Sequence, residues 1–219
     1  MRNTVIFDMD GTLLDTLEDM YLSTNVVLTE AGFPPRTRDE VRQFVGNGSR
    51  VLMRRCIEGG EANPKYEACH AAFQEYYHTH LNDHTTPYPG VVWLLDTLRE
   101  AGYPMAIVSN KTDSAVKDLN RDAFGDRIPV AIGAQDGVRK KPAPDTVYEA
   151  IRKLGVKKDA CVYVGDSETD LETAANAGIP CICVSWGFRG RAALEKLGAE
   201  QIADTAQELL DILKEYAGE

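Results

Sequence analysis

Asp8-Met9-Asp10-Gly11-Thr12 stands at the end of the short, mostly apolar run Thr4–Asp8. The run is typical of a buried β-strand, and residues two apart at its carboxyl end, such as Asp8 and Asp10, point the same way. Ligands of open α/β sheets bind beyond these strand ends, where the strand order reverses. Gly11 permits a tight turn, and Thr12 offers a hydroxyl and an amide to an anion. Taken alone, the segment fits a ligand site and an Asx-rich turn about equally well.

Outward from this segment the chain shows two patterns. A helical pattern covers most of residues 16–82, in segments near 16–31, 38–44, 49–58 and 64–82. From residue 87, helices near 90–100, 113–123, 144–154, 168–177, 191–197 and from about 205 alternate with strands near 104–108, 129–132, 160–164, 180–184 and, at an edge, 200–203. Alternating β and α elements indicate a parallel sheet with helices on both faces. We therefore predict an α/β fold, in which residues 1–15 and 87–219 form a doubly wound, Rossmann-like core and residues 16–86 form an inserted α-helical cap.

Composition restricts the partners of this chain. Its 219 residues can bury one substantial core with a smaller satellite domain. The formal charge of −10 argues against a general nucleic-acid binder, whereas a few local cations could still bind a phosphorylated small molecule. No apolar run reaches the length of a membrane span, and Val5-Ile6-Phe7 follows the amino terminus without a signal-peptide pattern. We expect a cytoplasmic protein that binds neither nucleic acid nor membrane, as a monomer or a homodimer.

Cysteine usage agrees with that compartment. The five cysteines are odd in number and form no CxxC pair. Neither a disulfide framework nor a zinc ribbon is therefore indicated. Cys181 and Cys183, two residues apart in an apolar run, would share one face of a strand. We expect buried, reduced thiols in a reducing cytosol.

Three further polar motifs follow predicted strands or precede predicted helices. Ser109-Asn110-Lys111 follows strand 104–108, and Gly165-Asp166-Ser167-Glu168-Thr169-Asp170 follows strand 160–164. Lys140-Lys141-Pro142-Ala143-Pro144 precedes a helix, and Pro142 favours an extended backbone at Lys141. Each motif alone fits helix capping or a solvated surface. Together with Asp8 and Asp10 they supply a nucleophile, a neutral phosphate binder, a cation and further acids, as phosphoryl transfer requires.

With these motifs the sequence resembles the haloacid dehalogenase superfamily, in its branch with a helical cap, and within it the phosphoglycolate phosphatases. The resemblance covers essentially the whole chain. Besides the strand-end motifs it includes Leu13-Leu14-Asp15, Gly46-Asn47-Gly48, Pro89-Gly90 and Trp186-Gly187-Phe188-Arg189. It implies a Mg²⁺-dependent hydrolase that removes phosphate from a small phosphorylated metabolite.

The resemblance also implies a role for each residue. Asp8 would be the nucleophile, already ionised at neutral pH, and Asp10 the acid–base residue. Mg²⁺ would be bound by the Asp8 and Asp166 carboxylates and the Asp10 main-chain carbonyl, with support from Asp170. The residues expected to bind the transferring phosphoryl group are Ser109 and Lys141, with further donors near Thr12 and Asn110.

The sequence leaves open the role of one cap loop and two alternative functions. Asn47 and Arg50 could contact the leaving group from the cap, although the loop that holds them fits a plain turn equally well. A phosphomutase resembling β-phosphoglucomutase would use the same two aspartates. A catalytically silent binding protein on this fold is the third possibility. A phosphonoacetaldehyde hydrolase fits less well because Asp10 is present, and a dehalogenase would not need these metal-binding acids.

Overall fold

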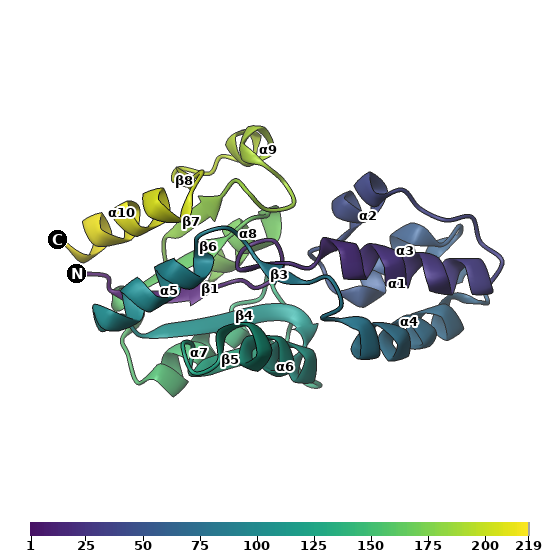
Figure 1. The fold of residues 1–219 in the computed structure, drawn as a ribbon, viewed down its shortest axis with the longest axis horizontal. Helices are drawn as coiled ribbons and strands as arrows, with labels where there is room; N and C mark the ends of the chain where they lie inside the picture. The colour runs from purple at the N-terminus through teal and green to yellow at the C-terminus, as the bar shows by residue number, and fades with distance from the viewer. Residues whose placement is uncertain (219) are drawn as a thin grey trace. The chain divides into compact units, whose positions relative to one another are not determined.

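The computed structural model describes residues 1–218, whose helices and strands are labelled in Figure 1. Two units divide the chain. One contains Met1–Leu14 and the chain from Pro87 onward, and the other contains Asp15–Thr86. The unit that begins the chain carries the sheet, and the inserted unit is helical.

A six-stranded parallel sheet forms the centre of the first unit, in the order β5-β4-β1-β6-β7-β8. Its strands are β1 (Thr4–Phe7), β4 (Met105–Thr112), β5 (Val130–Ala134), β6 (Cys161–Gly165), β7 (Cys181–Val184) and β8 (Ile202–Ala203). All residues of β1 and β6 are buried, as expected for strands covered on both faces. The parallel α/β fold predicted from the alternating pattern is confirmed.

The strand order reverses at β1. After β1 the sheet grows outward through β4 and β5, and the chain then crosses back to place β6 on the other side of β1. Phe7, the last residue of β1, pairs with Ile107 of β4 and with Val164 of β6. The segments after β1, β4 and β6 therefore lie side by side at a switch point, where α/β proteins bind ligands.

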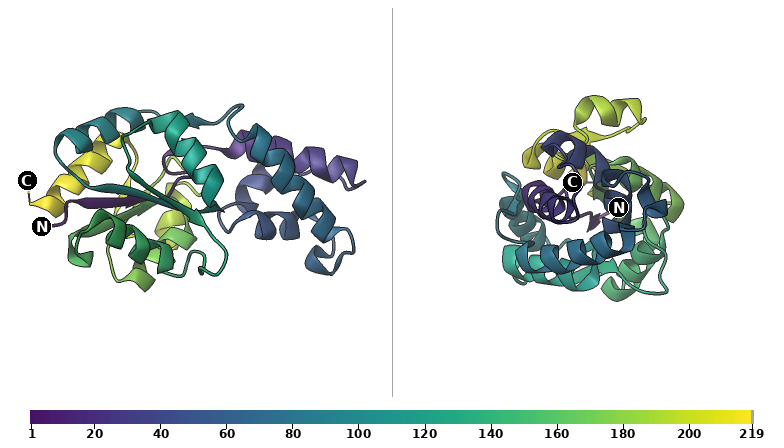
Figure 2. Two further views of the ribbon diagram at one scale, coloured as in Figure 1. Left: turned by 90° about the horizontal axis from the view of Figure 1, so that it is seen from below. Right: turned by 90° about the vertical axis from the view of Figure 1, so that its right-hand side faces the viewer.

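Helices cover both faces of the sheet, as the left view of Figure 2 shows. The helices α5, α6 and α10 lie on one face, and α7 and α8 lie on the other. Their bounds are α5 (Val91–Glu100), α6 (Asp113–Phe124), α7 (Asp145–Leu154), α8 (Glu168–Ala177) and α10 (Ala206–Ala217), with α9 (Arg191–Lys196) and the short 3-10 helix η2 (Lys158–Ala160) between strands. Val147 and Ala150 of α7 pack with Ile6 and Val108 in a buried cluster. This covering shields the strands from water and leaves their ends for polar residues.

Strand β4 is longer than the sequence suggests. We expected it to end at residue 108, but it continues to Thr112, which pairs with Ala134 of β5. The register is irregular between Val108 and Thr112. In the sequence, polar residues after an apolar run indicate a loop. In the structure, pairing with β5 keeps these residues in the sheet.

The inserted unit contains α1 (Leu17–Glu30), α2 (Arg38–Phe44), α3 (Ser49–Cys56), α4 (Tyr66–His80) and a 3-10 turn, η1 (Gly60–Ala62). Helix α2 begins with a capping box, in which Thr37 Oγ1 accepts the Glu40 N–H and Glu40 accepts the Thr37 N–H. Helix α1 packs against α2 and α4, and α3 packs against α2 and α4. Outside the short ribbon described next, the regular elements of this unit are helical.

The chain enters and leaves the inserted unit through β2 (Leu14–Asp15) and β3 (Thr86–Pro87), which pair as a two-stranded ribbon. Beside the ribbon, the buried Asp19 carboxylate accepts the main-chain N–H groups of His84 and Thr85 and the Thr85 hydroxyl. These bonds tie the first turn of α1 to the segment that precedes β3.

No helix in the described part of the chain is long and apolar enough to span a membrane. The cysteines are free thiols, and Cys56, Cys69, Cys161 and Cys183 are buried. Cys181 is partly buried and packs against the core cluster of the sheet.

Candidate active site

The acids predicted at the strand ends converge on one lysine. Asp8 follows β1, Asp170 lies in the first turn of α8, and Lys141 lies in the loop between β5 and α7. The Lys141 Nζ atom lies 2.7 Å from Asp8 Oδ1, 2.8 Å from Asp170 Oδ1 and 3.0 Å from the Tyr163 hydroxyl. All four side chains are buried, so each charge depends on its partners for stability.

Asp166, which follows β6, completes a cluster of three carboxylates. Asp8, Asp166 and Asp170 each offer one oxygen, and these oxygens lie within 4.8 Å of one another. One ammonium group, from Lys141, faces this set. Oxygen ligands and an excess of negative charge are the properties that Mg²⁺ requires, so the residues fit that ion.

Both oxygens of the buried Asp170 carboxylate accept hydrogen bonds from neighbouring residues. Its Oδ2 atom accepts the Ser167 hydroxyl and the main-chain N–H groups of Asp166 and Ser167. Its Oδ1 atom accepts Lys141 and Tyr163. Both oxygens are thus engaged by the protein, which fits the supporting role expected for Asp170.

Burial shifts the pKa values of the cluster. Desolvation, opposed by Lys141 and reinforced by Asp170 and Asp10, raises the pKa of Asp8 to about 7. Desolvation and the neighbouring carboxylates raise the pKa of Asp166 as well. Although burial lowers the pKa of Lys141, Asp170 and Asp8 outweigh it and hold that pKa well above 10.5. The protein groups alone therefore leave Asp8 only partly ionised at neutral pH, unlike the fully ionised state expected from its reference pKa.

The segment after β7 encloses Asp166. Phe188 donates its main-chain N–H to Asp166 Oδ2 at 2.6 Å. A Cβ atom at Gly187 would collide with the Asp166 side chain and with the Gly11 carbonyl oxygen. Arg189 forms a forked ion pair with Glu168, at 2.7 and 3.0 Å. The Gly187–Arg189 motif thus fixes Asp166, a role that its sequence did not reveal.

Asp10 points to a different set of partners. Its Oδ1 atom lies 3.1 Å from Lys111 Nζ, and its Oδ2 atom accepts the Ser109 hydroxyl at 3.3 Å. The Asp10 carboxylate is outside the three-acid cluster found among the described residues. Asn110, between Ser109 and Lys111, donates its side-chain amide to the Lys141 carbonyl oxygen at 3.1 Å. The predicted residues Ser109 and Asn110 therefore contact, respectively, the proposed acid–base residue and the backbone of the lysine.

Thr12 lies in the turn after Asp10. Its hydroxyl is buried without a hydrogen-bond partner in the described part of the chain. Its carbonyl oxygen accepts the indole N–H of Trp186 at 3.0 Å. This bond connects the first motif of the sequence to the segment after β7.

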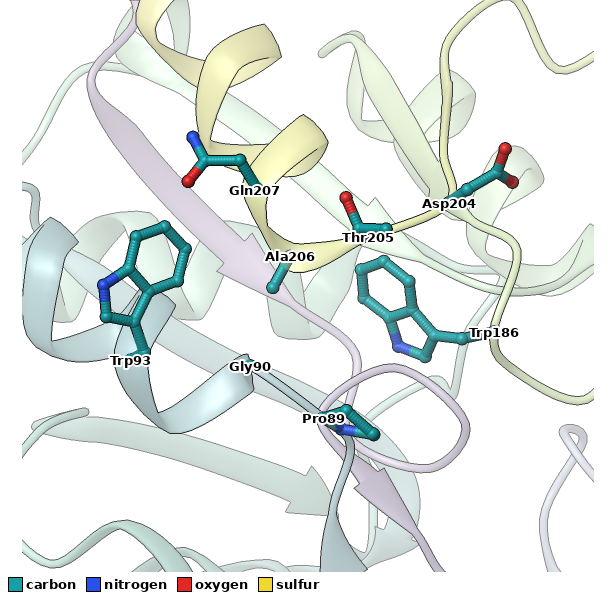
Figure 3. Close-up of a pocket in the computed structure, with 8 residues that line it drawn as sticks. All are labelled: Pro89, Gly90, Trp93, Trp186, Asp204, Thr205, Ala206 and Gln207. Atoms are coloured by element: carbon teal, nitrogen blue, oxygen red, sulfur yellow. The ribbon is translucent and has the colours of Figure 1, made fainter.

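A cavity of about 510 Å³ lies beside that connection, outside the acid cluster (Figure 3). It is lined by Pro89, Gly90, Trp93, Trp186, Asp204, Thr205, Ala206 and Gln207. None of the predicted catalytic residues lines it. The cavity therefore lies apart from the predicted catalytic residues.

The two predicted cap residues belong to the inserted unit. Asn47 is partly buried in the loop between α2 and α3. Arg50 is exposed. Its guanidinium donates two hydrogen bonds to the Glu67 carboxylate, at 3.1 and 2.6 Å, and lies over the Tyr66 ring. Arg50 is therefore held in place by its own unit.

Sequence reasoning missed Lys111, Tyr163 and the Arg189–Glu168 pair. Tyr163 has the pattern of a core aromatic residue, and its hydroxyl contact is visible only in three dimensions. Lys111 stands next to a predicted phosphate binder, and this position was the one available signal for it.

Comparison with known proteins defines the class of this site. The model of the haloacid dehalogenase-like hydrolase family matches residues 5–184. The chain belongs to this family of hydrolases, as its motifs predicted.

Several relatives and solved structures are similar to this chain over most of its length. The chain is 37% identical to the phosphoglycolate phosphatase of Rhodobacter capsulatus, over 86% of this chain and 87% of that protein. It is 32% identical to phosphoglycolate phosphatase 1 of Pseudomonas aeruginosa, over 94% and 78%. Among solved structures, a candidate phosphoglycolate phosphatase from Lactobacillus delbrueckii superposes with a TM-score of 0.92 at 34% identity, covering 97% of this chain and 99% of that one. CbbY of Rhodobacter sphaeroides, in complex with phosphate, gives 0.77 at 26% identity, covering 95% and 96%.

Proposed function

We propose that this chain is a phosphatase that hydrolyses a small phosphate monoester through an aspartyl phosphate on Asp8, with 2-phosphoglycolate as the preferred substrate. The observation that carries the proposal is the contact of Asp8 with a buried lysine inside the three-carboxylate cluster. A buried cation and acids at a sheet switch point are the parts that phosphoryl transfer requires. The similarity to proteins named phosphoglycolate phosphatase supports the choice of substrate.

In the first half-reaction, an Asp8 oxygen forms a bond to phosphorus while the bond from phosphorus to the leaving oxygen breaks. Asp10 gives its proton to that leaving oxygen, which departs as an alcohol. Lys141 and Ser109 bind the oxygens of the transferring group, where charge stabilisation contributes most. Lys141 already lies at hydrogen-bond distance from Asp8, so it is placed to act at the reacting atoms.

In the second half-reaction, Asp10 takes a proton from water as the water oxygen attacks phosphorus. The bond between phosphorus and Asp8 breaks, and inorganic phosphate is released. The same Asp10 side chain thus serves as acid and then as base.

Asp8, Asp166 and the Asp10 carbonyl would hold Mg²⁺, which supplies positive charge to offset the repulsion between carboxylate and phosphate. The three carboxylate oxygens that cluster beside Lys141 support this assignment. Asp170 supports the site by fixing Lys141 and the main chain of Asp166.

The test is release of inorganic phosphate from a panel of phosphate esters that includes 2-phosphoglycolate, with Mg²⁺ and with EDTA. We expect turnover with Mg²⁺, its loss in EDTA, and a higher kcat/KM for 2-phosphoglycolate than for the other alkyl esters. Phosphate release that required a sugar bisphosphate would instead indicate a phosphomutase. A complete lack of turnover on every ester would indicate a binding protein and contradict the proposal.

A further inference from the structure

The Asp10 carboxylate is held at both of its oxygens by residues of one strand. Ser109 and Lys111, both in β4, contact Oδ2 and Oδ1 respectively. The Ser109 oxygen in turn accepts the main-chain N–H of Lys111 at 3.1 Å. Asp10, Ser109 and Lys111 are thus linked to one another by these contacts, which help to orient the carboxylate.

Lys111 is not an ordinary surface lysine. Its side chain is 7% exposed, and that of Asp10 is 16% exposed. A buried ammonium group is costly unless an opposite charge and hydrogen bonds compensate it. The Lys117–Asp113 pair of the following helix shows the contrast, because its lysine side chain is 58% exposed.

The two oxygens of Asp10 have different neighbours. Oδ2 lies beside Ser109, the residue proposed to bind the phosphoryl group, whereas Oδ1 faces Lys111. Oδ2 is therefore the Asp10 oxygen that lies nearer to the residue proposed to bind the transferring group. A partial rotation of the carboxylate would lengthen both contacts.

We propose that Lys111 is a positioning residue, which keeps Asp10 Oδ2 directed at the leaving oxygen and, in the second half-reaction, at the attacking water. The inference rests on the proposed function, since it requires Asp10 to transfer protons. Lys111 acts through Asp10 and does not bind the substrate. Precise placement of a proton donor contributes strongly to rate, so its loss is measurable.

A double-mutant cycle tests this assignment, with an alkyl phosphate and p-nitrophenyl phosphate as substrates. Lys111→Met should lower kcat for the alkyl ester by roughly 10- to 100-fold, within the usual contribution of general acid–base catalysis. The loss should be smaller for p-nitrophenyl phosphate, whose leaving group needs little protonation. Lys111→Arg should restore part of the alkyl-ester rate because it retains a cation.

The decisive variant combines Lys111→Met with Asp10→Asn. If Lys111 acts only through Asp10, the double variant should match Asp10→Asn alone within about twofold, since residues of one unit are non-additive. If the rate losses of the two single variants multiplied in the double variant, the proposal would be overturned. Equal losses of kcat for both esters in Lys111→Met would overturn it as well. An unchanged rate in Asp10→Asn would instead refute the proposed function, so the two failures are distinguishable.

Controls separate positioning from folding. Lys117→Met removes an exposed lysine–aspartate pair of the same unit and should leave kcat unchanged. Thermal unfolding checks that each variant is folded. If Lys111→Met does not fold, Lys111→Gln takes its place in the cycle with the same expected outcomes.

Discussion

At the scale of single residues, Asp8 is defined by its surroundings. It shares the Lys141 ammonium with Asp170, and burial raises its pKa. A buried carboxyl with a nearby cation at a sheet switch point is a frequent property of catalytic residues. The first two predictions follow from the environments of Asp8 and Asp166.

Asp8→Asn should abolish steady-state turnover while the protein stays folded, because an amide cannot form the acyl phosphate. Lys141 keeps Asp170 as a partner in this variant, so the buried cation is not left uncompensated. Phosphate release and thermal unfolding measure the two effects. Substantial activity, once deamidation back to aspartate has been excluded by mass spectrometry, would contradict the covalent mechanism.

Gly187→Ala should weaken activation by Mg²⁺, since its Cβ atom would displace the Asp166 side chain or the Gly11 carbonyl. We expect the Mg²⁺ concentration for half-maximal activity to rise by about 10- to 100-fold, as for other residues that orient metal ligands. Gly190→Ala controls for general destabilisation, because its φ of +72° strains the backbone of an alanine while no atom lies within 4 Å of the added Cβ. Equal Mg²⁺ dependence in both variants would show that Gly187 does not position Asp166.

The sequence predicted that Asp8, Asp166 and Lys141 belong to one site because carboxylates at strand ends form short, recognisable motifs, and the structure brings these side chains together. It did not identify Lys111, since a lysine that follows a strand usually lies in solvent. Only the continuation of β4 to Thr112 places Lys111 against Asp10. The role of Asp170 in fixing Lys141 likewise depends on a contact between positions 29 residues apart.

At the scale of elements, the loop between α2 and α3 is the candidate for substrate selection. It contains Asn47 and leads into α3, where Arg50 is fixed by Glu67 and Tyr66. A guanidinium already oriented by a neighbour loses less freedom when it binds an anion. Arg50 is thereby oriented within its own unit, and substrate selection by Arg50 and Asn47 stays a prediction.

Arg50→Ala and Asn47→Ala should therefore change the ranking of substrates more than the rate on acetyl phosphate. We expect kcat/KM for 2-phosphoglycolate to fall by about tenfold or more relative to acetyl phosphate in Arg50→Ala, the effect of one lost charged hydrogen bond. Arg38→Ala, which removes another exposed arginine–glutamate pair of the same unit, is the matched control. An unchanged ranking in both loop variants would mean that specificity lies elsewhere.

The sequence predicted most helices and strands because their apolar periods are regular. It placed the end of β4 too early and did not predict the ribbon of β2 and β3 or the 3-10 turns. These elements depend on pairing between distant segments or on very few residues. A pattern within one segment carries little information about either.

At the scale of the whole molecule, the buried acids make stability depend on pH. The pKa of Asp8 is about 7 in the folded protein and 3.8 in the reference state, so the folded protein retains a proton that the unfolded chain loses between these values. Stability from this group is therefore lost as the pH rises from about 4 to above 7. The pKa of Asp166 is raised in the same direction.

In EDTA, the free energy of unfolding should thus decrease from pH 5 to pH 8, and Asp8→Asn should reduce that decrease. Added Mg²⁺ should stabilise the wild type more at pH 8 than at pH 5, because a cation favours ionised ligands. Urea unfolding at both pH values measures these differences. Identical pH dependence in the wild type and Asp8→Asn would show that this carboxyl does not titrate as inferred.

The bond between Trp186 and Thr12 also gives the protein an optical probe of its own catalytic segment. Indole emission responds to hydrogen bonding and to nearby charge, and Trp186 is joined directly to the turn that follows Asp8 and Asp10. The chain has two tryptophans, and the other, Trp93, is 46% exposed. Replacing Trp93 with Phe would leave Trp186 as the single tryptophan, which can be excited selectively at the red edge of indole absorption. Its spectrum could then follow ion binding and phosphorylation in real time, without any attached dye.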